Sequence, residues 1–152
     1  MKELSERTRE FLTLAGWSAE RHIDITPYVS ALESEGYVIN PFAKKFLEQF
    51  GGLVGKQPAY RARDEFENIH FDPIKVCEGI FRSCIETYEE KIKETLVVVG
   101  EAHDEHLTLT ISESGKMYAT YGSYFTLLGN DYIEGLDALF LCKKTPEIDM
   151  SA

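Results

Sequence analysis

The chain has few cysteines, no long apolar run and no apolar segment at its N-terminus. Its three cysteines are an odd number, and Cys77 and Cys84 lie seven positions apart in a segment that we predict to be helical. Seven helical residues span about 10.5 Å, whereas the Cα atoms of a disulfide lie within about 7 Å, so we expect reduced thiols. No stretch approaches the roughly 20 apolar residues of a membrane helix, and residues 1–7 lack the apolar run of a signal peptide. We therefore expect a cytoplasmic protein that does not enter a membrane.

Basic residues are also scarce. The chain carries 16 Lys and Arg residues against 26 Asp and Glu residues, which gives a net charge of −10. Residues 101–152 hold nine of the acidic residues and three of the basic ones. Direct nucleic-acid binding is disfavoured, because affinity for phosphates depends on Lys and Arg. The same charge would attract a basic partner, although solubility alone also explains it.

Signatures of common catalytic sites are absent. The sequence contains no Gly-x-Ser-x-Gly turn, no phosphate-binding loop ending in Gly-Lys-Ser/Thr and no Gly-x-Gly-x-x-Gly loop. His70 could form a catalytic pair with Asp72, but Asp72 precedes Pro73 and is better placed to cap a helix, with His70 on the far face of the sheet. Cys77 and Cys84 would have to serve as nucleophiles, and we predict both to be buried and inert. We expect no catalytic residue.

Two histidines lie among acidic residues between two predicted strands. His103 and His106, together with Glu101, Asp104 and Glu105, could hold a divalent metal, because imidazoles and carboxylates both donate lone pairs. Spacing of three residues within a loop is unspecific, however, and a polar hairpin connection explains it equally well. We predict no metal and no cofactor, and a metal-dependent hydrolase that uses the two histidines remains an alternative.

Capping residues and apolar spacing predict the helices. Three short helices begin near Ser5, Pro27 and Pro41, and Asp72-Pro73 starts the longest one, at about 74–91. The apolar stripe of this long helix is predicted to comprise Cys77, Ile80, Phe81, Cys84, Ile85 and Tyr88. A final helix over 131–142 is capped by Asn130, and the tail from residue 143 is predicted to be loose.

The predicted strands gather in the second half of the chain, at 95–99, 107–111, 116–121 and 124–128. Residues 53–71 add two or three short strands, drawn from Leu53-Val54, 60–63 and 69–71. Tight turns between neighbouring strands imply antiparallel pairing. The sequence thus predicts the α+β class: a mostly antiparallel sheet of about five to six strands with helices packed on it. We expect one compact domain over 1–152, with a core at about 5–142.

An ordered set of short motifs runs through nearly the whole chain. They are Ala15-Gly16-Trp17, Arg21-x-Ile23-Asp24-Ile25, Gly36-Tyr37, Phe46-Leu47-x-x-Phe50-Gly51-Gly52-Leu53, His70-Phe71-Asp72-Pro73 and Gly115-Lys116-Met117-Tyr118. Over about residues 10–142 this set resembles the third subgroup of the SUKH immunity proteins. The resemblance implies a non-catalytic protein that binds a bacterial polymorphic toxin, often a nuclease or deaminase, and blocks its active site. A regulatory or scaffold module in cell-wall or signalling control is the alternative that distant members of the superfamily suggest.

The motifs specify turns and helix ends, so residues that contact a partner must lie elsewhere. The acidic character of the chain and the resemblance together favour a basic toxin domain as the partner. The carboxylates that we predict to contact it lie in two segments that flank strands: Asp64, Glu65 and Glu67, and Glu101, Asp104 and Glu105.

Overall fold

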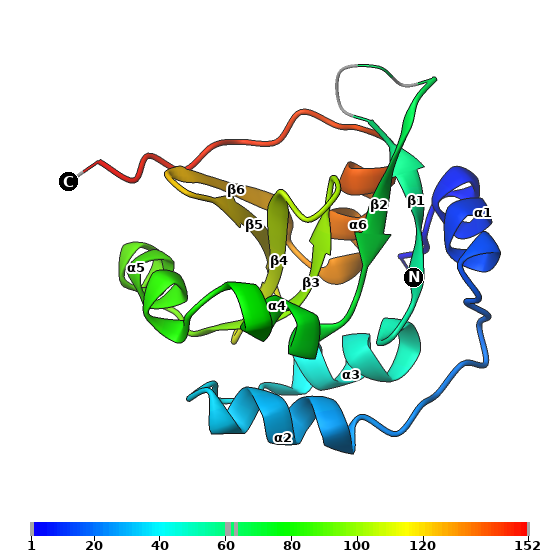
Figure 1. The fold of residues 1–152 in the computed structure, drawn as a ribbon. Coiled ribbons are helices and arrows are strands. Elements are labelled where there is room, and N and C mark those ends of the chain that lie inside the picture. Colours follow the sequence, from blue (N-terminus) through cyan, green and yellow to red (C-terminus); the bar gives the residue numbers. More distant parts are fainter. Residues whose placement is uncertain (1, 60–61, 63, 152) are drawn as a thin grey trace.

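The computed structural model describes residues 2–59, 62 and 64–151. Within these residues the helices are α1 (Glu6–Leu14), α2 (Thr26–Ser34), α3 (Pro41–Phe50), α4 (Pro73–Gly79), α5 (Arg82–Ile92) and α6 (Tyr132–Phe140). The strands are β1 (Val54–Pro58), β2 (Phe66–His70), β3 (Leu96–Ala102), β4 (Leu107–Ser112), β5 (Met117–Tyr121) and β6 (Tyr124–Gly129). They form one sheet in chain order, and every neighbouring pair is antiparallel (Figure 1). The predicted α+β class and single domain are confirmed.

Helices cover both faces of the sheet, because successive strand residues point to opposite sides. Met117 of β5 faces α6, where a Cβ added to Gly135 would come within 3.0 Å of the Met117 side chain. Tyr118, the next residue, stacks on Phe125, whose ring lies 4.9 Å from that of Tyr88 on α5. The sheet therefore lies between α6 on one side and α5 on the other (Figure 1).

Aromatic side chains fill the core. The largest fully buried ones are Phe46, Phe50, Phe71, Phe125 and Phe140. Trp17 stacks on Phe50 with the ring centroids 5.8 Å apart, so it packs on the core as expected. Helix capping also follows the sequence at Ser5, Asn40 and Asp72, whose side chains accept backbone N–H groups of α1, α3 and α4.

Three expectations about the elements are wrong. The long helix at 74–91 is two helices, because Ile80 and Phe81 adopt extended backbone angles between α4 and α5. As a result Phe81 is 78% exposed and Cys84 is also exposed, so neither belongs to a core stripe. The last helix is capped by Asp131, whose Oδ1 accepts the N–H of Glu134 at 2.9 Å, and not by Asn130. In the sequence, Gly79 indicated the break between α4 and α5, since glycine is a poor helix former.

The third expectation concerns the tail, which is not loose at 145–148. Thr145 and Pro146 contact the hydroxyl of Thr126, and the Ile148 N–H donates to the Phe125 carbonyl at 2.7 Å. The tail thus pairs along the edge of β6, where its backbone groups find partners.

The strand considered at 60–63 falls mainly on residues 60, 61 and 63, which lie outside the described residues. In the described part of the chain, no helix combines the length and apolarity that crossing a bilayer requires.

Candidate functional site

A row of four buried polar side chains crosses the sheet on the face that α5 covers. The strand register places His70 of β2 opposite Glu101 of β3, Glu101 opposite Thr108 of β4, and Thr108 opposite Thr120 of β5. All four residues are at most 7% exposed. Cross-strand partners on one face lie close enough for their side chains to interact, so this row is the polar centre of the site.

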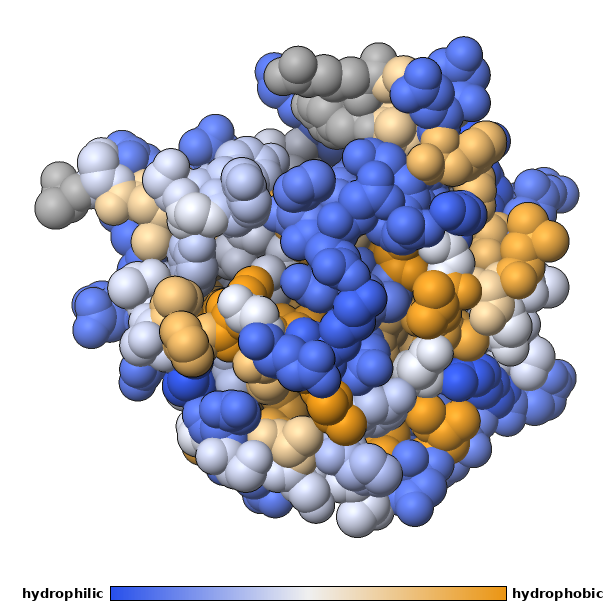
Figure 2. All heavy atoms as spheres, viewed as in Figure 1, coloured by the Kyte–Doolittle hydropathy of each residue, from blue (hydrophilic) through white to orange (hydrophobic). Residues whose placement is uncertain are grey.

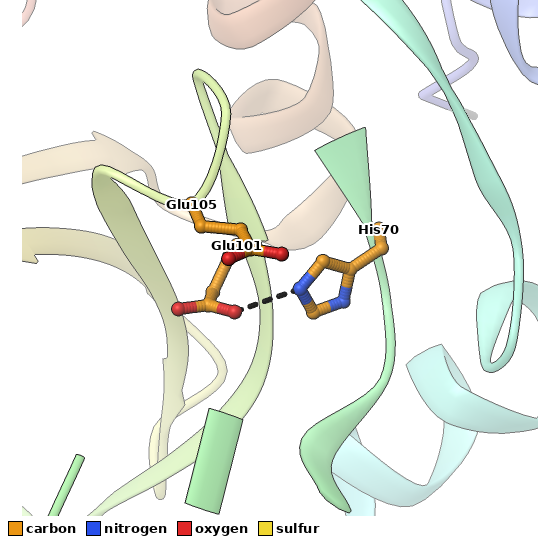
Figure 3. A group of neighbouring side chains, drawn as sticks. All are labelled: His70, Glu101 and Glu105. Atoms are coloured by element: carbon orange, nitrogen blue, oxygen red, sulfur yellow. Dashed lines mark hydrogen bonds and ion pairs between the residues drawn. The ribbon is translucent and has the colours of Figure 1, made fainter. Parts of the chain in front are cut away.

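The row begins with a hydrogen-bonded pair. His70 Nε2 lies 2.8 Å from Glu101 Oε1 (Figure 3). The backbone N–H of Asp72 donates to His70 Nδ1 at 3.1 Å. Because a backbone N–H can only donate, Nδ1 must be the unprotonated nitrogen, and Nε2 carries the proton that it donates to Glu101. The second carboxylate oxygen of Glu101 points away from the imidazole (Figure 3).

Close approach of two backbones allows this pair to form. A Cβ added to Gly100 would collide with the carbonyl of His70 and lie 2.9 Å from Phe71 Cα, so only glycine fits where β3 passes β2. We expected Glu101 to lie in the connection between two strands, and this is wrong. β3 continues past Gly100 to Ala102, which makes Glu101 a buried strand residue.

Three residues at this point could be considered as metal ligands. One ligand atom from each of His70, Glu101 and Glu105 lies within 4.8 Å of the others. A histidine that binds metal through Nε2 almost always donates its other N–H to an acceptor. Here Nδ1 faces the N–H donor of Asp72, so a neutral imidazole has no lone pair left on Nε2. The protonation state that the backbone enforces therefore favours the hydrogen-bonded pair over a metal.

The turn at 103–106, between β3 and β4, is held against β2. His103, Asp104 and Glu105 all have positive φ angles, between 52° and 74°. Asp104 Oδ1 accepts the N–H of Asn68 at 2.7 Å, and its own N–H donates to the Asn68 carbonyl. His103 Nδ1 lies 2.7 Å from Glu67 Oε1. These contacts compensate the backbone strain and fix the turn beside β2.

The structure thus brings together the two predicted acidic segments, 36 residues apart at the Glu67–His103 contact. Asp64, Glu65, Asp104 and Glu105 are exposed, Glu67 is half-buried and Glu101 is buried. Glu105 forms an ion pair with Lys75, and the hydrogen bond within this pair lowers the pKa of the Glu105 carboxyl. Both side chains are about half exposed, so the pair contributes little stability. We call Asp64, Glu65, Glu67, Asp104 and Glu105 the acidic edge.

The two histidines of this turn have separate partners. His103 contacts Glu67, whereas His106 Nδ1 lies 3.0 Å from the His103 carbonyl and its ring meets Tyr121 edge-on. Their arrangement is that of the polar hairpin connection considered from the sequence.

Beside the polar row lies a groove that sequence analysis missed. It has a volume of about 670 Å³ and lies between α5 and the strands. Its floor includes Glu101, Thr108 and Thr120, while Phe81 and Cys84 line the helix side. In Figure 2 hydrophobic side chains gather beside α5, next to a band of hydrophilic ones that runs down the middle of this face. Gly79, just before the helix break, was a sequence sign that Phe81 could turn outward.

The cysteines differ in exposure, and neither of the two candidates has the surroundings of a catalytic nucleophile. Burial raises the pKa of the Cys77 thiol to about 11, which keeps it protonated at neutral pH. Cys84 is exposed and lies in the groove wall, which corrects its predicted burial.

Comparison with known proteins identifies the family. The model of the SUKH-3 immunity proteins matches residues 4–141, which is most of the chain. No curated protein and no solved structure matches the chain. Immunity proteins of this kind are typically non-catalytic and act on a polymorphic toxin. The chain therefore belongs to the SUKH-3 immunity protein family, and its partner is a cognate toxin.

Proposed function

We propose that the chain neutralises, in the cytoplasm, a toxin that acts on nucleic acid, and that it does so by covering a basic active site with the acidic edge. The observation that carries this proposal is the position of the 103–106 turn against β2. Through the Glu67–His103 and Asn68–Asp104 contacts, Glu67 and Asp104, which are distant in sequence, lie close together.

Electrostatics explains why this arrangement suits a nuclease or a deaminase. Such toxins must bind phosphates, so their substrate grooves carry Lys and Arg. Carboxylates on the immunity protein would occupy positions where the substrate's phosphates lie. Exposed charges of this kind mainly accelerate association, and their effect weakens as salt rises. The net charge of −10 adds a long-range attraction to the local one.

Two experiments on the cognate toxin domain test the proposal. Cells that express the toxin domain should survive only when the chain is co-expressed. In solution, the purified chain should abolish cleavage or deamination of a labelled oligonucleotide at one chain per toxin domain. Full toxin activity in the presence of excess chain would contradict the proposal, and so would inhibition without a complex on size-exclusion chromatography.

A further inference from the structure

The groove beside α5 has the composition of a protein-binding site. Phe81 is 78% exposed and Tyr121 is 61% exposed, and both line it, from the helix side and the strand side respectively. The Tyr88 hydroxyl donates to the Gly122 carbonyl, which ties α5 to the turn between β5 and β6, and both residues line the groove. Exposed apolar side chains that share one hollow and are rimmed by polar residues are typical of a site that a protein partner covers.

Charge is distributed unevenly around this groove. Glu101 and Glu105 lie at the end next to the 103–106 turn. Among the residues that the structure describes, no lysine or arginine lines the groove. Lys75, which does not line the groove, pairs with Glu105 in a half-exposed ion pair that a competing cation can replace at little cost. The second oxygen of Glu101 is directed away from His70 (Figure 3), and Glu101 lines the groove.

We infer that the groove binds a segment of the toxin in which an apolar side chain lies next to a lysine or arginine. This inference rests on the proposed function. The apolar side chain inserts between Phe81 and Tyr121, and the cation reaches Glu101 and Glu105. A volume of about 670 Å³ accommodates a few side chains. Apolar anchors in a partly enclosed site contribute most of the affinity in typical interfaces, while surrounding charges contribute to specificity. The acidic edge, which continues from Glu105, would form the polar rim.

Cys84 allows a direct test without changing the groove. It is the exposed one of the three cysteines, whereas Cys142 is buried and the pKa of Cys77 is about 11. N-ethylmaleimide should therefore react first at Cys84. Saturating amounts of the inactivated toxin domain should slow this reaction at least about tenfold, as burial in an interface core does. The control is the double variant Cys84→Ser, Leu14→Cys, which moves the reactive thiol to an 86% exposed position on α1. N-ethylmaleimide should alkylate this control variant as fast with bound toxin as without it.

A second measurement tests the cation. Glu105→Gln should weaken toxin binding about tenfold, as loss of one partner of a close charge pair does. Glu90→Gln, an equally conservative change at an exposed position of α5, should leave the affinity unchanged.

The outcomes separate the two proposals. If toxin binds and Cys84 is alkylated at an unchanged rate, the groove is not the binding site and the inference is wrong, while the proposed function stands. If Cys84 is protected but Glu105→Gln binds as tightly as the wild type, the inference that a lysine or arginine of the toxin reaches Glu105 is wrong. If the wild-type chain binds no toxin, both the proposed function and this inference are overturned.

Discussion

His70 donates its Nε2 proton to Glu101 Oε1 over 2.8 Å, and both side chains are almost fully buried. The same imidazole accepts the N–H of Asp72, the capping residue of α4. One side chain therefore connects the start of α4 to the middle of the sheet. The residue that the sequence placed on the far face of the sheet is therefore buried there, with only 5% of its surface exposed.

We predict that His70→Ala lowers the free energy of unfolding by about 3 kcal/mol, because it leaves a buried carboxylate without its donor. Glu101→Gln keeps an acceptor for Nε2 and should cost clearly less. Urea unfolding followed by circular dichroism measures both variants. A loss below about 0.5 kcal/mol for His70→Ala, typical of a surface position, would refute the buried pair.

Two phenylalanines should differ sharply in their contribution to stability. Phe50 is fully buried, so Phe50→Ala should cost about 3–5 kcal/mol. Phe81 is 78% exposed, so Phe81→Ala should change the free energy of unfolding by less than about 0.5 kcal/mol. Thermal and urea unfolding measure both variants. If Phe81→Ala lowered the free energy of unfolding as much as Phe50→Ala does, α4 and α5 would form the continuous helix that the sequence predicted.

The contrast between these residues shows which features the sequence could predict. The caps Ser5, Asn40 and Asp72 were predictable because capping depends on a few neighbouring residues. The hairpin of β4 and β5 was predictable from alternating side chains and a glycine turn. The polar row was not, because the pairing of Thr108 with Glu101 and Thr120 depends on strand register across the sheet. Likewise, apolar spacing in Cys77–Tyr88 fits one helix as well as two that pack on the same core.

Removing the tail should expose an edge of the sheet. Deletion of residues 145–152 removes the backbone hydrogen bonds to Phe125 and Leu127 and should cost about 2–3 kcal/mol. The unpaired edge of β6 should also promote self-association. Thermal unfolding and light scattering measure the two effects. Glu147→Ala, which keeps the backbone pairing, serves as the control, and a deletion variant as stable and monomeric as this control would show that the tail does not stabilise β6.

The chain should bind no zinc or manganese stoichiometrically. The Asp72 N–H keeps the Nε2 proton on His70, so Glu101 and Glu105 lack their nitrogen co-ligand, and His103 is engaged by Glu67. Calorimetric titration of chelator-stripped protein should show no site with micromolar or tighter affinity. One tight site that disappears in His70→Gln or in His103→Ala would overturn this prediction.

The central claim is that the acidic edge guides the chain onto a basic toxin. The most direct test measures the association rate with the inactivated toxin domain for the double variant Asp64→Lys, Glu65→Lys. These positions lie outside the groove, and the change spares Glu67 and Asp104, which hold the 103–106 turn. The control Glu86→Lys, Glu90→Lys alters the net charge equally on the exposed side of α5. The account predicts that the edge variant associates at least about tenfold more slowly and loses most of its salt dependence, while its dissociation rate and the control variant's rates change little. Association at the wild-type rate, or an equal loss in both variants, would contradict it.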